Sequence, residues 1–128
     1  MESIMLDVNW TAVVVGAVLA FIAGWVWYSP KVFGTKWASG SKITMSGTKQ
    51  MPMAPMLAQA VGTFLFAWVI GVTETTSNIA LAILIAITFA VLVKAAGLFS
   101  QKSKYAIWVD ASYILVMALI MILTHAVL

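Results

Sequence analysis

The chain has 128 residues, of which 63% are hydrophobic and 9% charged, and its mean hydropathy is +1.06. A soluble domain is about half apolar and about a quarter charged, so the composition excludes a water-soluble fold and indicates that the solvent is lipid. The basic residues are seven dispersed lysines, which give a formal net charge of +3, and this pattern excludes the dense basic face of a nucleic-acid-binding protein.

Four segments reach the length of roughly 20 apolar residues that a helix needs to cross the hydrocarbon core of a membrane. The predicted spans are residues 10–28, 55–73, 79–99 and 105–127. The first span ends at Ser29-Pro30 because proline disfavours helix in the preceding residue, and Pro55 suits the first turn of the second span. The predicted fold class is all-α: a single domain over residues 1–128, built as an antiparallel bundle of four transmembrane helices.

The links between the spans predict the orientation. The long link 31–54 carries four lysines and the tight link 100–104 carries two, whereas residues 1–9 and 74–78 carry none. Under the positive-inside rule, the two lysine-bearing links lie in the cytoplasm. We therefore expect a multi-pass protein of the cell (inner) membrane with both termini on the non-cytoplasmic side.

Small residues recur at every fourth position of the first span, at Ala12, Gly16, Ala20 and Gly24. Helices in lipid associate through close backbone contact, so this row is predicted to be a helix-packing face. A similar row, Ala82, Ala86 and Ala90, lies in the third span. The sequence leaves open whether such rows pack within the chain or against another chain, including a second copy.

The fourth span has a polar face. Asp110, Tyr113, Met117, Met121 and Thr124 are spaced by three or four residues, so they share one side of a helix. An acidic residue inside a membrane helix normally faces the bundle interior or a water-filled cavity.

The predicted partner of Asp110 is Lys94, because the two residues lie at similar depth on either side of the link 100–104. We therefore expect an intramembrane ion pair between Lys94 and Asp110. In the alternative, Lys94 extends to the membrane interface and Asp110 reaches the headgroups or water.

Residues that could carry chemistry are sparse. The chain has no cysteine and no phosphate-binding loop, hydrolase motif or paired carboxylates. His125 is the single histidine, and a metal or haem would need a second ligand beside it. The methionine-rich segment 51–56 offers thioethers to copper(I), but it also suits apolar packing at the interface. We predict no enzyme, no catalytic residues, no cofactor and no metal.

A specific motif follows the first span: Trp27, Tyr28, Ser29, Pro30, Phe33, Gly34 and Trp37, preceded by Asn9-Trp10 and Gly24. With Asp110-Ala111-Ser112-Tyr113, it resembles the signature of a bacterial membrane family described as domain of unknown function 1761 (DUF1761). Asp110 stands where that family usually has asparagine, and Ile114 where it often has histidine. The resemblance implies a small four-helix integral membrane protein and no assigned activity.

The motif also has a physical interpretation. Its helix-breaking Ser29-Pro30 and the turn at Phe33-Gly34 predict an interfacial elbow, with Trp37 folding back onto the membrane surface. Such an elbow either sets the exit of the first helix or offers a docking surface to a partner.

The function that fits these features best is a non-catalytic accessory subunit that packs against a larger membrane complex. Its expected partners are the lipid bilayer and other membrane subunits. The main alternative is a homo-oligomeric transporter or pore, lined by the polar face that carries Tyr113 and Thr124. A third hypothesis is an enzyme or cofactor carrier that uses His125 or the methionines.

Overall fold

The computed structural model describes residues 4–29, 31–41 and 53–128, and over these residues the chain is helical and contains no strand. The helices are α1 (Trp10–Trp27), α2 (Gly34–Gly40), α3 (Met53–Glu74), α4 (Ile79–Phe99) and α5 (Lys104–Val127). The four long helices are apolar enough to cross a membrane. The prediction of an all-α chain with four apolar spans is confirmed. Each of the four long helices begins and ends within two residues of the predicted position.

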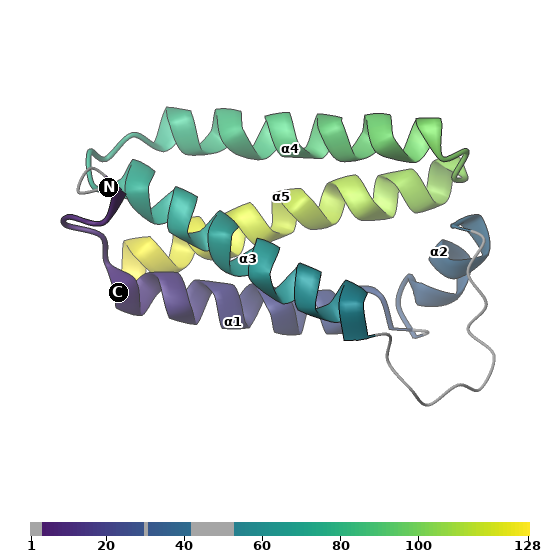
Figure 1. Ribbon diagram of the computed structural model, residues 1–128, viewed down its shortest axis with the longest axis horizontal. Helices are drawn as coiled ribbons and strands as arrows, with labels where there is room; N and C mark the ends of the chain where they lie inside the picture. Colours follow the sequence, from purple (N-terminus) through teal and green to yellow (C-terminus); the bar gives the residue numbers. More distant parts are fainter. Residues whose placement is uncertain (1–3, 30, 42–52) are drawn as a thin grey trace.

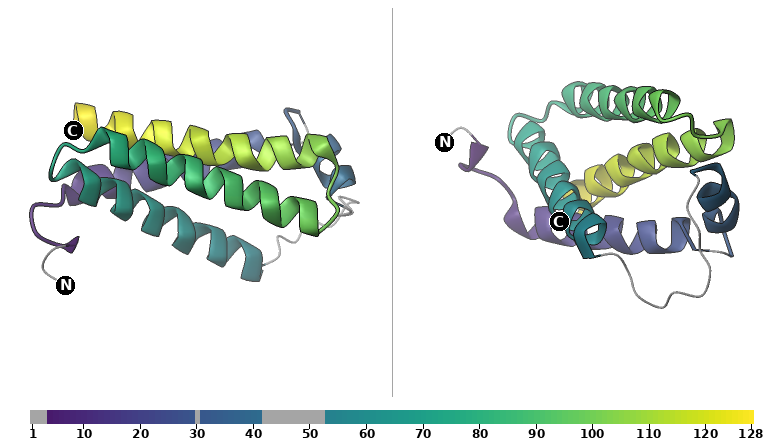
Figure 2. Two further views of the ribbon diagram at one scale, coloured as in Figure 1. Left: turned by 90° about the horizontal axis from the view of Figure 1, so that it is seen from above. Right: turned by 45° about the vertical axis from the view of Figure 1, so that its right-hand side comes forward.

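Helix α5 is the centre of the molecule, since it contacts each of the other four helices. Figure 1 shows α4 along one side of α5 and α1 along the other, with α3 running obliquely across them. The first described residues and the C-terminus lie at one end, and α2 lies at the opposite end beside the α4–α5 link (Figures 1 and 2). Of the residues in the most apolar stretch of α5, 44% are buried within the protein, and the corresponding share for α4 is 17%. Helix α4 therefore has the most surface available to lipid.

The long helices begin and end with local polar contacts. The side chains of Asn9, Asn78 and Ser103 each accept a hydrogen bond from a backbone N–H in the first turn of the helix that follows. Helix α4 is followed by a left-handed residue, Gln101 (φ 58°), and the Lys102 N–H donates to the Gly97 carbonyl at 3.0 Å. This turn brings Lys102 back toward the start of α5.

The small-residue row of α1 is covered by α5. Ala12 and Ala20 are fully buried. A Cβ added to Gly16 would lie 2.8 Å from the Thr124 hydroxyl, and one added to Gly24 would collide with the Tyr113 ring. The row is thus a packing face within the chain, as the intramolecular interpretation expected.

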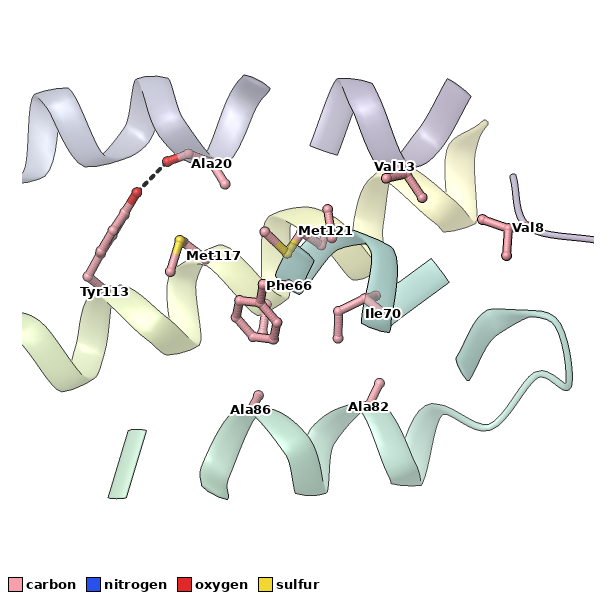
Figure 3. Close-up of a cluster of buried hydrophobic side chains, with 12 residues drawn as sticks. Val8, Val13, Ala20, Phe66, Ile70, Ala82, Ala86, Tyr113, Met117 and Met121 are labelled. Atoms are coloured by element: carbon pink, nitrogen blue, oxygen red, sulfur yellow. Dashed lines mark hydrogen bonds between the residues drawn. The ribbon is translucent and has the colours of Figure 1, made fainter. Parts of the chain in front are cut away.

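The core lies where α3 and α5 meet α1 and the first half of α4. It combines the large side chains of Phe66, Ile70, Met117 and Met121 with the buried alanines Ala82 and Ala86 (Figure 3). Small residues on α1 and α4 let the neighbouring helices approach closely, and the long side chains of α3 and α5 fill the space between them.

The link 31–54 was predicted without a helix, and α2 corrects this prediction. Its sequence, GTKWASG, has glycine at both ends and no side-chain cap, so local propensity does not favour a helix. Packing stabilises it instead, because Ala38 is 3% exposed and Trp37 is half-buried. Pro30, and the methionine-rich segment as far as Pro52, lie outside the described residues.

Candidate functional site

The elbow after α1 is a tight turn closed by backbone hydrogen bonds. The Gly34 N–H donates to the Ser29 carbonyl at 2.8 Å, and the Phe33 N–H donates to the Trp27 carbonyl at 3.3 Å. A Cβ on Gly34 would collide with the Tyr28 carbonyl oxygen, so only glycine fits at this point. The turn directs α2 back toward the start of α5.

Asp110 receives three donors from three separate segments of the chain. The Tyr28 hydroxyl and the Trp37 indole N–H both donate to Oδ1, at 2.6 and 2.8 Å. The Lys102 ammonium group lies 2.9 Å from Oδ2 and forms an ion pair. The Asp110 side chain is only 14% exposed. We call these four residues, Tyr28, Trp37, Lys102 and Asp110, the Asp110 cluster.

Aromatic rings enclose the cluster. The Tyr28 ring packs edge-on against Trp37, with centroids 4.7 Å apart, and against Tyr113 at 5.5 Å. Burial raises the pKa of Tyr28 well above its usual value, and the hydrogen bond to Asp110 and the carboxylate charge raise it further. Tyr28 therefore keeps its proton at neutral pH and remains a donor to the carboxylate.

Three further hydrogen bonds join α1 and α2 to α5 and to Ser103, the N-cap residue of α5. The Trp27 indole donates to the Val109 carbonyl at 3.1 Å, and the Ser103 N–H donates to the Gly40 carbonyl at 3.0 Å. The Tyr113 hydroxyl donates to the Ala20 carbonyl at 2.6 Å (Figure 3). The motif identified in the sequence is thus folded against the first three turns of α5, and Trp37 is directed to Asp110 rather than spread on the membrane surface.

The predicted ion pair between Lys94 and Asp110 is wrong, because Asp110 pairs with Lys102. Lys94 is exposed and lies over the Trp108 ring, 5.5 Å from its centroid. Lys94 and Asp110 lie at similar depth, but equal depth does not make them partners. Asp110 faces Tyr28 and Trp37, away from the face of α5 that carries Trp108. The signal for Lys102 was its position in the tight link, directly before Ser103, the N-cap residue of α5.

The rest of the polar face of α5 is turned inward. Tyr113, Met117, Met121 and Thr124 are all buried, and the Thr124 hydroxyl donates to the Met121 carbonyl of its own helix at 2.8 Å. His125 is also buried, and its Nδ1 lies 2.9 Å from the same carbonyl. The hydrogen bond of this histidine therefore lies inside the protein.

The geometry of the Asp110 cluster is that of a fixed structural contact. Both carboxylate oxygens accept hydrogen bonds from donors on packed side chains, and such charge-assisted bonds are stronger than neutral ones. Over the described residues, no group of three histidine, cysteine or acidic side chains is arranged to hold a metal ion. The cluster therefore holds the elbow, the α4–α5 link and α5 together.

Replacing Tyr113 with phenylalanine is expected to lower the free energy of unfolding by about 1 kcal/mol, because a buried hydrogen bond to α1 is lost while the ring packing is kept. Thermal unfolding in a mild detergent measures the change. The matched control is Tyr105→Phe, at a ring that is 36% exposed. Equal losses in the two variants would show that the Ala20 contact contributes nothing.

A family model described as a protein of unknown function, DUF1761, matches residues 11–126. No curated protein and no solved structure matches the chain. The matched region includes the elbow, the Asp110 cluster and nearly all of α1 and α5.

Proposed function

The chain belongs to the DUF1761 family, and we propose that it is a non-catalytic integral membrane protein that serves as an accessory subunit of a larger membrane complex. The observation that carries the proposal is that its polar side chains form hydrogen bonds within the same chain. Asp110 and Tyr113, which belong to the polar face that was a candidate transport path, bind other segments of the same chain, and the Thr124 hydroxyl donates within α5.

The proposal includes a membrane topology. The four long helices form an antiparallel bundle in the cell membrane, with the elbow and the α4–α5 link in the cytoplasm and both termini outside. The placement of charge supports this orientation, because α2 and the α4–α5 link lie at the end of the molecule opposite the termini, and lysines occur in both.

The position of the polar face favours an accessory role over transport. A pore between several copies needs polar groups on a surface where the copies meet. Tyr113 is 4% exposed and Thr124 is 9% exposed, and both face the inside of a single chain. A transport function would require the helices of each copy to separate and uncover these groups.

Extraction from native membranes tests the proposal. The tagged chain is solubilised in a mild detergent and separated on a native gel, and the polypeptides that migrate with it are identified by mass spectrometry. We expect it to migrate with other membrane polypeptides in a fixed ratio, and a stronger detergent that dissociates complexes serves as the control.

Migration as a small homo-oligomer would contradict the accessory role and make transport the leading function. Ion or solute flux in proteoliposomes would then be compared between the wild type and Asp110→Asn. Unchanged flux in that variant would exclude Asp110 from a transport path.

A further inference from the structure

One exposed face of α5 gathers cations around aromatic rings. Tyr105 and Trp108 are three residues apart, so they project from the same side of the helix. Lys36 of α2 lies over the Tyr105 ring, 5.0 Å from its centroid, and Lys94 of α4 lies over the Trp108 ring at 5.5 Å. Lys104 opens the helix beside them. We call these five residues, Lys36, Lys94, Lys104, Tyr105 and Trp108, the lysine–aromatic shelf.

The positive charge of the shelf is not neutralised by the described part of the chain. Lys102–Asp110 is the one ion pair among the residues that the structure describes, and it lies outside the shelf. Lys36, Lys94 and Lys104 are all exposed. Three lysine side chains contributed by three helices therefore present uncompensated positive charge on one surface.

The shelf adjoins the apolar surface that faces lipid. Lys94 lies five residues before the end of α4 at Phe99, and Lys104 is the first residue of α5. Val91 and Leu98 lie three residues before and four residues after Lys94, so they share its side of α4, and they are 57% and 59% exposed. Positive charge and apolar surface are therefore adjacent where α4 ends and α5 begins. In a membrane, this is the level at which the headgroups lie.

We propose that the lysine–aromatic shelf binds the headgroup of an anionic phospholipid of the surrounding membrane. The ammonium groups of Lys36, Lys94 and Lys104 contact the phosphate, and the Tyr105 and Trp108 rings lie at the headgroup level, as in interfacial aromatic belts. The acyl chains lie along the exposed sides of α4 and α5. This site requires only that the helices span a bilayer, so it does not depend on the accessory role.

A lipid fits this surface better than a soluble anion or an acidic protein segment. The apolar side chains beside the lysines match acyl chains that are covalently joined to the phosphate. A soluble anion would make no use of that apolar surface.

Lipid retention in native mass spectrometry tests the proposal. The protein is reconstituted in nanodiscs that mix phosphatidylglycerol with phosphatidylcholine, and the lipids that stay bound after release are counted. We expect the wild type to prefer phosphatidylglycerol. A variant carrying both Lys36→Gln and Lys94→Gln should bind it about 25-fold more weakly, since each lysine near an anionic headgroup contributes a factor of about five.

The matched control is Lys31→Gln, an exposed lysine outside the shelf, with an expected change below about twofold. Added sodium chloride should lower retention by the wild type, which checks the charge term without any substitution. Equal retention in the double variant and the control would overturn the proposal. So would displacement of the lipid by glycerol phosphate or by an acidic peptide at matched concentration, because the acyl chains would then contribute nothing.

Discussion

Replacing Asp110 with alanine is expected to lower the free energy of unfolding by about 3 kcal/mol. The substitution leaves the Lys102 ammonium group, the Tyr28 hydroxyl and the Trp37 indole without their shared acceptor. Removing one partner of a buried ion pair costs roughly 3–5 kcal/mol, and the lower value applies because Lys102 is 28% exposed. Asp110→Asn should cost about 1 kcal/mol, since the amide oxygen still accepts from Tyr28 and Trp37.

Unfolding of each variant in mixed micelles measures these differences, with Asp7→Asn as the control at an exposed carboxylate. The order wild type, Asp110→Asn, Asp110→Ala is the expected order of decreasing stability. If Asp110→Ala were as stable as Asp7→Asn, the cluster would not hold the elbow to α5.

Replacing Gly34 with alanine should be almost as damaging, with a loss of about 3 kcal/mol. The added methyl group would collide with the Tyr28 carbonyl oxygen and lie 2.7 Å from the Ser29 carbonyl carbon. Both obstacles are backbone atoms, so the clash cannot be relieved by moving a side chain. The expected cost is therefore at the upper end of the usual range for overpacking, roughly 1–3 kcal/mol.

Gly62 provides the matched control, since a Cβ added there has nothing within 4 Å. Gly62→Ala should leave stability unchanged or raise it by up to about 1 kcal/mol, because alanine favours helix more than glycine does. Thermal unfolding of the two variants side by side is the measurement. Similar behaviour of the two would mean that the elbow turn is not as tight as described.

Much of the fold was predictable, because length and hydropathy decide where a membrane helix lies. The span predicted at 79–99 coincides with α4 (Ile79–Phe99). The row of small residues on α1 predicted a packing face, because helices in lipid associate through close backbone contact. What the sequence left open was whether the partner of Gly16 and Gly24 came from the same chain.

The ion pair of Asp110 was predicted wrongly because a sequence gives depth along a helix more easily than direction around it. Lys94 and Asp110 share a depth, but the Asp110 side chain is directed toward α1 and α2. The choice of Lys102 depends on the left-handed turn at Gln101, which no feature of the hydrophobic pattern indicates. Polar contacts of this kind depend on the packing of distant segments.

Helix α2 was not predicted for a related reason. Seven residues with glycine at both ends have little tendency to form a helix alone. The helix depends on Trp37 reaching Asp110 and on the backbone bond from Ser103 to Gly40, both made by residues far along the chain. The sequence motif predicted the position of the elbow. The contact between this motif and α5 depends on the fold and was not predicted.

The most direct test of the central claim, that the elbow is fastened to the start of α5, is a disulfide crosslink between Gly40→Cys and Ser103→Cys. An added Cβ on Gly40 lies 3.0 Å from the Ser103 Cβ, about 0.5 Å below the range found in disulfides, so a small outward shift of the end of α2 brings the pair into range. The chain has no cysteine of its own, so only the introduced pair can react. In native membranes we expect rapid oxidation of this pair and none of Gly62→Cys with Ser103→Cys. Failure of the first pair to crosslink, or equal crosslinking of both pairs, would contradict the account.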